Sequence, residues 1–263
     1  MAETLKMQTK INGEGRPIIL VPGGLTGWQS WEPFIEIFSS KGREVILVQL
    51  LSVQYGIEKR ELPPNYSVKT ESASLAAALD SLGYHEPLDF VAWSFGALTT
   101  LDFALDNPER IRTLTLIEPP AIWILRETGM INEQTMRIFN FFETLTGEIT
   151  EDMLASFLME AGFVKEGLTA RELPQWNGWL PFRRSLRNCP AAVHHRDKLN
   201  RLKNFNHPVL LFKGTGSAPF LHNIIDGLDS AFPDSKVIEM AGGHAPHIVS
   251  RENFLVELEK FQQ

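Results

Sequence analysis

Residues 88–97 have the sequence LDFVAWSFGA, an apolar run that is followed at once by a serine and then by helix-forming residues. The segment 92–96, AWSFG, is close to the G-x-S-x-G turn that lifts a nucleophilic serine above a strand-to-helix junction. That turn needs small residues around the serine, because larger side chains would collide with neighbouring backbone, and Ala92 replaces the first glycine. We therefore predict that Ser94 is a nucleophile. The alternative is that Ser94 only caps the helix that follows.

Short apolar runs alternate with helix-length segments on both sides of this turn. The strand-like runs occupy residues 17–21, 44–48, 88–93, 113–117, 209–212 and 236–240. Such runs are typical of parallel strands that are covered on both faces. From residue 121 to residue 205 the pattern is helical, and a loop of that length without structure would be unusual. We predict an α/β core, residues 1–120 and 206–263, that is interrupted by a helical cap over residues 121–205.

A glycine-rich loop, VPGGL at residues 21–25, follows the first of these core strands. Its backbone N–H groups can stabilise an oxyanion, and we predict that Gly24 and Phe95, the residue after the serine, supply the two donors. The alternative is a turn that contains glycine for conformational reasons only. A phosphate-binding loop is disfavoured because the G-x-x-x-x-G-K-[ST] pattern is absent from this loop.

A histidine follows the last strand-like run, in the loop GGHAPH at residues 242–247. Imidazole is the usual base for a serine because its pKa lies near working pH. We predict His244 as that base and prefer it to His247 because it directly follows the two glycines. The alternative is a loop histidine without a catalytic role. A metal site at His194–His195 is disfavoured because spaced carboxylate partners are missing, so we predict no metal.

Five segments, VPGGLTG, AWSFGA, LTLIEPP, VLLFKGTGS and AGGHAPH, together resemble the α/β-hydrolase superfamily over nearly the whole chain. The resemblance implies a mostly parallel eight-stranded sheet flanked by helices, a cap after the sixth strand, and a nucleophile–acid–histidine triad. The family usually places its acid after the seventh strand, where this chain has Ser217, which cannot carry a charge. Some members place it after the sixth strand, so the predicted acid is Glu118. The alternative is that Glu118 only hydrogen-bonds cap backbone.

Aromatic residues gather beside the predicted nucleophile and in the predicted cap, in a chain with 17 Phe and 6 Trp. An apolar lid over a serine indicates a pocket for a small molecule. The predicted pocket residues are Leu25, Trp93, Trp123, Trp176 and Trp179. The alternative is that most of these aromatic residues pack the cap onto the core.

The composition excludes several other classes of protein. The 25 Lys and Arg against 32 Asp and Glu give a net charge of −7, which offers no electrostatic basis for binding nucleic acid. The single Cys189 cannot form an intrachain disulfide and is interpreted as a buried or loop thiol. No apolar run is long enough to span a membrane, and the polar start shows no secretory signal. We expect a cytoplasmic protein whose partner is a small-molecule substrate.

A serine nucleophile with a histidine base favours acyl transfer through an acyl-enzyme, without metal or organic cofactor. We predict hydrolysis of a small, largely apolar ester, lactone or thioester. Two alternatives remain open. One is another reaction at the same residues, namely cofactor-free C–C bond hydrolysis, a lyase reaction or a haloperoxidase-like activity. The other is a small-molecule sensor with little turnover.

Overall fold

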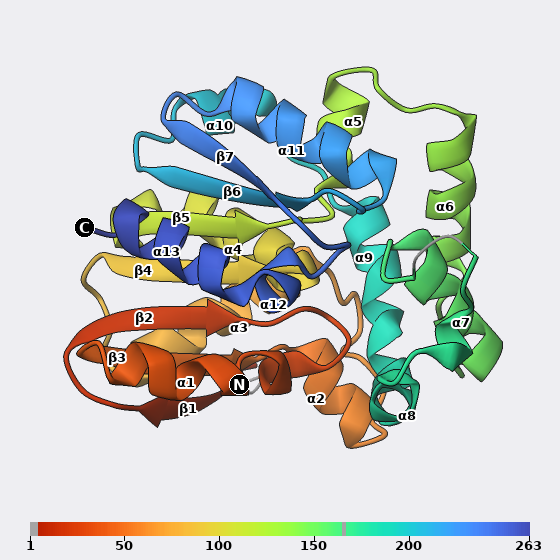
Figure 1. The fold of residues 1–263 in the computed structure, drawn as a ribbon, viewed down its shortest axis with the longest axis horizontal. Coiled ribbons are helices and arrows are strands. Elements are labelled where there is room, and N and C mark those ends of the chain that lie inside the picture. The colour runs from red at the N-terminus through yellow and green to blue at the C-terminus, as the bar shows by residue number, and fades with distance from the viewer. Residues whose placement is uncertain (1–4, 165–166) are drawn as a thin grey trace.

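A single sheet runs through the computed structural model, which describes residues 5–164 and 167–263 (Figure 1). Its strands are β1 (Gln8–Asn12), β2 (Arg16–Val21), β3 (Arg43–Gln49), β4 (Leu88–Trp93), β5 (Ile111–Ile117), β6 (Val209–Gly214) and β7 (Ser235–Met240). They lie in the order β1-β3-β2-β4-β5-β6-β7. Only β1 runs antiparallel to its neighbour, so the sheet is mostly parallel, as predicted.

The strand count differs from the predicted eight, because the described residues form a seven-stranded sheet. No described segment pairs with the outer edge of β1, where an eighth strand could have been added. The six strands predicted from apolar runs all occur as β2 to β7. The additional strand, β1, has a largely exposed and polar sequence, QTKIN, which explains why apolar periodicity does not reveal it.

Helices cover both faces of the sheet, as the continuous burial of side chains along the central strands β3, β4 and β5 requires (Figure 1). The core helices are α1 (Glu32–Ser39), α2 (Leu51–Ile57), α3 (Val68–Ser81), α4 (Ser94–Asp106), α11 (Pro219–Ala231), α12 (Pro246–Val249) and α13 (Arg251–Phe261). One buried cluster joins α1 and α13 to one face of the sheet. A larger cluster joins α3, α4 and α11 to the other face and extends into the inserted segment.

The segment between β5 and β6 contains helices and connecting loops in its described residues, and no strand. Its helices are α5 (Ile122–Glu127), α6 (Glu133–Glu143), α7 (Glu151–Glu160), α8 (Trp176–Trp179), a 3₁₀ helix (Leu180–Asn188), a shorter 3₁₀ turn (Ala170–Glu172), α9 (Cys189–His194) and α10 (Leu199–Lys203). In Figure 1, α6 to α9 gather beyond the carboxyl ends of the strands, whereas α5 and α10 pack on α11. Because the first and last helices of the segment pack on a core helix, the bounds of the predicted cap, residues 121–205, remain a prediction.

Local capping explains where the helices of this segment begin. The Thr150 hydroxyl accepts a hydrogen bond from the Met153 N–H at 3.2 Å and so caps the start of α7. Asn132 and Thr135 form a reciprocal capping box at the start of α6. Among the described helices, none combines the length and apolar character that a bilayer crossing requires.

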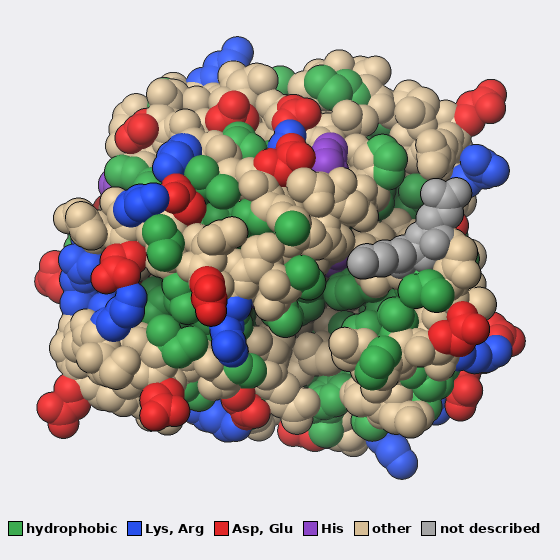
Figure 2. Space-filling model, viewed as in Figure 1, with side chains coloured by type: hydrophobic (Ala, Val, Ile, Leu, Met, Phe, Trp, Pro, Cys, Tyr) green, Lys and Arg blue, Asp and Glu red, His purple; other side chains and the backbone are tan. Residues whose placement is uncertain are grey.

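Surface charge is mixed on the face that Figure 2 presents, where acidic and basic side chains are interspersed with small groups of hydrophobic side chains. The viewed face therefore carries no extended field of one sign, in keeping with a net charge of only −7 in 263 residues.

Candidate functional site

The turn between β4 and α4 holds Ser94 in a backbone conformation that residues with a side chain rarely adopt, with φ +54°. Such strain persists only where the surrounding structure imposes it, and it is common at functional sites. Gly96 shows why small residues are needed here, because a Cβ at this position would lie 2.0 Å from the Pro22 carbonyl oxygen. Ala92 is fully buried in the same turn. The close packing of these small residues lets the chain expose the serine above the sheet.

Sheet register brings Ser94 and Glu118 to neighbouring positions although they are far apart in the sequence. Trp93, the last residue of β4, pairs with Ile117, the last residue of β5. The next residues, Ser94 and Glu118, therefore leave the sheet side by side at its carboxyl edge. Glu118 also has a positive φ, +45°, so both strands end in a strained residue that redirects its side chain.

His244 connects these two side chains. Its Nε2 atom lies 2.7 Å from Ser94 Oγ, and its Nδ1 atom lies 2.7 Å from Glu118 Oε2. A carboxylate only accepts hydrogen bonds, so Nδ1 carries the proton and Nε2 is free to accept the serine hydroxyl proton. His244 is 3% exposed and Glu118 is 0% exposed, so water does not compete for this pair. The structure thus brings the three predicted triad residues together.

The second oxygen of Glu118 is held by two donors. Oε1 accepts hydrogen bonds from the Gly214 N–H at 2.7 Å and from the Ser217 hydroxyl. These bonds compensate the burial of a carboxylate, which would otherwise be costly. Ser217, at the position where the resemblance leads one to expect the acid, therefore contacts the predicted acid, Glu118, which follows β5.

The backbone around His244 is also anchored. The Trp93 indole N–H donates to the His244 carbonyl oxygen at 2.7 Å, and the His244 N–H donates to the Gly162 carbonyl oxygen at 3.2 Å. The ring meets Phe163 edge to face, with ring centroids 5.0 Å apart. Position and ring orientation of His244 therefore depend on both the core and the inserted segment.

His247 lies away from the serine, packed between Trp31 and Trp93 at centroid distances of 4.8 and 4.9 Å. Neither of its ring nitrogens has a hydrogen-bond partner among the described residues. Burial in this apolar site lowers the pKa of His247 to about 3, with a smaller contribution from nearby His244. The preference for His244 over His247 agrees with this arrangement.

A cavity opens over Ser94, and Gly24 and Phe95 border it beside the serine. Its described lining residues are Gly23, Gly24, Leu25, Trp93, Ser94, Phe95, Pro120, Phe142, Phe157, Ala161, Phe163, Leu186, Asn188, Cys189, Ala192, Phe220, Leu221 and His244. The cavity volume is about 50 Å³, several times the roughly 10–15 Å³ that one water needs. None of the described lining residues is an Asp, Glu, Lys or Arg. The site can therefore receive a small, apolar group beside the serine.

The residues that line the cavity differ in part from those predicted for the pocket. Leu25 and Trp93 line it, but Trp123 is buried within the core on α5. Trp176 lies outside the wall, with the Arg171 guanidinium 5.6 Å from its ring centroid. Trp179 borders a neighbouring hollow that shares Trp93 and His244 with the site. Proximity of aromatic residues in the sequence does not predict which ring faces the cavity, because helix packing decides that orientation.

The residues missed in the sequence come mainly from the inserted segment and from α11. Phe142, Phe157 and Phe163 form aromatic walls, and Asn188 adds an amide. Cys189 lines the cavity as a buried thiol whose pKa is raised by burial. A thiol in this state is a poor nucleophile, which agrees with its interpretation as a buried side chain.

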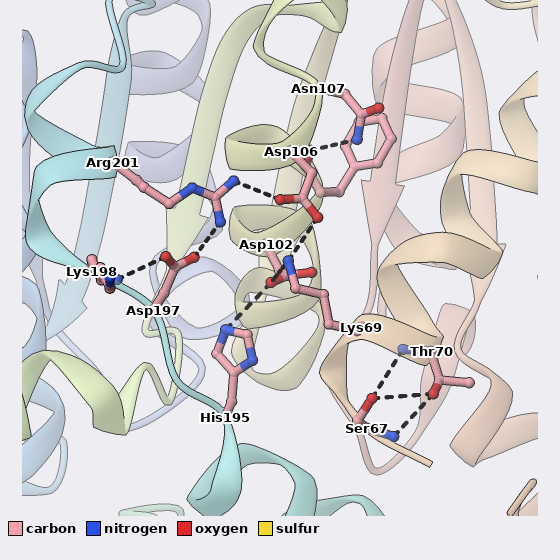
Figure 3. Close-up of polar contacts among 11 residues, drawn as sticks. Ser67, Lys69, Thr70, Asp102, Asp106, Asn107, His195, Asp197, Lys198 and Arg201 are labelled. Atoms are coloured by element: carbon pink, nitrogen blue, oxygen red, sulfur yellow. Dashed lines mark hydrogen bonds and ion pairs between the residues drawn. The ribbon is translucent and has the colours of Figure 1, made fainter. Parts of the chain in front are cut away.

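A second cluster of titratable groups lies on α4 and the chain between α9 and α10 (Figure 3). His195 has the carboxylate partners that the sequence pattern did not reveal, since Asp102 and Asp197 lie beside it in the fold. Nε2 of His195 is 3.4 Å from Asp102 Oδ1, and burial lowers the pKa of this histidine. His194 points elsewhere, with its Nε2 atom 3.1 Å from Glu143.

Two basic side chains already pair with the carboxylates of this cluster (Figure 3). Lys69 Nζ lies 2.9 Å from Asp102 and 2.7 Å from Asp106. Arg201 lies 2.6 Å from Asp106 and 2.8 Å from Asp197. The cluster is therefore an ionic network that joins the end of the inserted segment to α3 and α4, the helix that begins at the serine.

The chain belongs to the α/β-hydrolase family, because a family model for the alpha/beta hydrolase fold matches residues 16–250. Among its curated relatives are enzymes that are named hydrolases and esterases. It is 24% identical over 268 residues to a pimeloyl-[acyl-carrier protein] methyl ester esterase of Aliivibrio salmonicida, covering 100% of this chain and 97% of that protein.

Another relative is similar over a shorter region. The chain is 35% identical over 108 residues to a 2-hydroxy-6-oxo-2,4-heptadienoate hydrolase of Pseudomonas putida, covering 40% of this chain and 38% of that enzyme. Among solved structures, an esterase from Exiguobacterium antarcticum superposes with a TM-score of 0.78 at 14% identity, covering 97% of this chain and 95% of that one. At this identity the likeness is one of fold.

Proposed function

We propose that the protein hydrolyses a small, uncharged and largely apolar ester, lactone or thioester through an acyl-enzyme on Ser94. The observation that carries this proposal is the pair of 2.7 Å contacts that His244 makes with Ser94 and Glu118 at the floor of an apolar cavity. Family membership and relatives named as esterases support the reaction class.

In the first half-reaction, Ser94 Oγ attacks the substrate carbonyl carbon while His244 Nε2 takes the hydroxyl proton. Glu118 holds the other ring nitrogen in the protonated tautomer and stabilises the imidazolium that forms. The backbone N–H groups of Gly24 and Phe95 are the proposed donors to the negatively charged carbonyl oxygen. The tetrahedral intermediate then collapses, and the leaving group departs with the proton from His244.

In the second half-reaction, a water molecule attacks the acyl carbon and gives a proton to His244 Nε2. The same oxyanion donors serve this step, and the bond from the acyl carbon to Ser94 Oγ breaks as the proton returns to the serine. The products are a carboxylic acid and the regenerated enzyme.

The cavity supports a neutral acyl group. Its described polar side chains are Ser94, Asn188, Cys189 and His244, so a substrate carboxylate would find no basic partner of the Lys or Arg type among them. Burial of an unpaired carboxylate is costly. This observation favours ester hydrolysis over the alternative of C–C bond hydrolysis on an anionic substrate, such as the dienoate that the name of one relative specifies.

A matched pair of substrates tests the proposal. We expect purified protein to hydrolyse p-nitrophenyl butyrate and to be labelled at Ser94 by a fluorophosphonate, with both activities lost in Ser94→Ala. The corresponding hemisuccinate ester, similar in length but anionic, should have a kcat/KM lower by about 100-fold or more, because its charge must be desolvated. A wild-type protein that neither hydrolyses these esters nor becomes labelled would contradict the proposal and favour a sensor.

A further inference from the structure

One polar side chain of the inserted segment reaches across the cavity to the glycine-rich loop of the core. Asn188, the last residue of the 3₁₀ helix Leu180–Asn188, is 2% exposed and lines the cavity beside Gly24 and Phe95. Asn188 carries the one side-chain amide among the described lining residues, which are otherwise mostly apolar. A buried amide in such a position requires partners, and the partners show what it positions.

The Asn188 amide group binds two separate segments of the core. Its Nδ2 atom donates to the Gly24 carbonyl oxygen at 3.2 Å and to Ser52 Oγ at 3.3 Å. Its Oδ1 atom accepts a weaker bond from the Cys189 thiol at 3.5 Å. Both stronger bonds therefore connect the inserted segment to the core rather than stabilising the segment itself.

On the core side, the Asn188 amide reaches the glycine-rich loop at Gly24. Gly23 and Gly24 are adjacent, and glycine allows a wide range of backbone angles. A hydrogen bond to the Gly24 carbonyl fixes the plane of the following peptide and limits the rotation of the residue that carries the proposed oxyanion donor. The approach is close, since a Cβ at position 24 would lie 2.2 Å from Asn188 Nδ2. This contact gives a physical reason for glycine at position 24.

The Ser52 end is anchored in the core. The Ser52 and Leu51 N–H groups each donate to the Glu71 carboxylate at 2.9 Å, and the Tyr66 hydroxyl donates to it at 2.5 Å. Ser52 and Glu71 are fully buried, and burial raises the pKa of the Glu71 carboxyl group. Asn188 therefore connects a buried hydrogen-bond network of the core to the glycine-rich loop.

We propose that Asn188 is a positioning residue: its bond to the Gly24 carbonyl limits the rotation of Gly24 and so keeps the Gly24 N–H in the orientation needed to stabilise the oxyanion. The inserted segment would thereby help to assemble the catalytic site. This inference rests on the proposed acyl transfer at Ser94. It goes further, because it assigns a role in transition-state stabilisation to a residue that does not react. Loss of one whole oxyanion donor costs about 10²–10³-fold in kcat, so a misplaced donor should cost about 10- to 100-fold.

The test compares two inhibitors that share one acyl chain. A trifluoromethyl ketone accepts Ser94 Oγ at its carbonyl carbon and places a negatively charged oxygen where the oxyanion would be. The matched methyl ketone occupies the cavity as a ground-state analogue. In Asn188→Leu, which keeps the approximate size of the side chain and removes the N–H donor without adding a charge, we expect kcat to fall about 10- to 100-fold. The inhibition constant of the trifluoromethyl ketone should rise by a similar factor, and that of the methyl ketone by less than about twofold.

Two further variants separate positioning from packing. Asn188→Ala should show the same selective loss, and because each comparison is made within one variant, partial unfolding does not imitate it. Leu186→Ala removes an apolar part of the same wall and should weaken both ketones to a similar extent. If both Asn188 variants weaken the two ketones equally, or weaken neither, the positioning role is wrong. If wild-type protein forms no adduct with the trifluoromethyl ketone, the proposed function itself fails.

Discussion

The Ser217 hydroxyl donates a hydrogen bond to Glu118 Oε1, so the residue at the position expected for the acid supports the proposed acid, which follows another strand. Glu118 follows β5, whereas Ser217 follows β6, and these strands are neighbours in the sheet. From its place at the end of β5, Glu118 Oε2 lies 2.7 Å from His244 Nδ1. The histidine therefore contacts a buried carboxylate, and Ser217 is one of the two donors to the other oxygen of that carboxylate.

Glu118→Gln should lower kcat by about 10³–10⁴-fold for an ester substrate, because a neutral amide cannot stabilise the imidazolium or enforce the tautomer. The substitution keeps the shape of the side chain, so the midpoint of thermal unfolding should change little. Kinetics with p-nitrophenyl butyrate and a thermal melt measure the two effects. Glu36→Gln, at an exposed position on α1, is the control and should retain full activity. Near-normal turnover of Glu118→Gln would show that the acid is elsewhere.

Ser217→Ala should reduce kcat more modestly, by about 3- to 10-fold, because Glu118 Oε1 keeps its bond from the Gly214 N–H. The double variant Glu118→Ala/Ser217→Asp should recover at least about 10-fold of the activity lost in Glu118→Ala, since it returns a carboxylate to the usual position. Steady-state kinetics of the wild-type protein, Ser217→Ala, Glu118→Ala and the double variant measure the loss and the recovery. A double variant no better than Glu118→Ala would mean that an acid at position 217 cannot reach His244.

Gly96→Ala should destabilise the protein by more than about 2 kcal/mol and abolish labelling of Ser94 by a fluorophosphonate. The added Cβ would lie 2.0 Å from the Pro22 carbonyl oxygen, so the turn must shift to accept it. Gly178→Ala is the matched control, because a Cβ there meets no atom within 4 Å. Urea unfolding and labelling rates compare the two variants. Equal behaviour of both would argue against a sterically constrained turn.

His247 should make the protein sensitive to acid. Its pKa is about 3 in the folded state, below the ordinary value of 6.5, so the unfolded chain binds the proton first as pH falls. The stability that neutral His247 contributes is complete above pH 6.5 and is lost progressively between pH 6.5 and pH 3, at up to about 1.4 kcal/mol per pH unit. His247→Phe should therefore flatten this part of the profile. Urea unfolding at pH 7, 5.5 and 4.5 tests it, and parallel profiles for both proteins would contradict the prediction.

Much of the framework is predictable from the sequence because its causes are local. The steric demands of the AWSFG turn identify Ser94, and short apolar runs identify β2 to β7. The position of its loop at a strand end points to His244, and the family resemblance adds Glu118. The polar edge strand β1 carries no comparable apolar signal, and the orientation of Trp123 depends on how α5 packs.

The sequence by itself determined the alternation of strands β2 to β7 with helical segments, the small-residue turn at Ser94 and the residue types available for acyl transfer, because sterics and hydrophobic periodicity act over a few residues. Only the tertiary structure decided which side chains meet. Glu118 and His244 are 126 positions apart, and Asn188 and Gly24 are 164 apart. Hydrogen bonds of this kind depend on distances of a few tenths of an ångström between separate elements, and packing alone sets those distances.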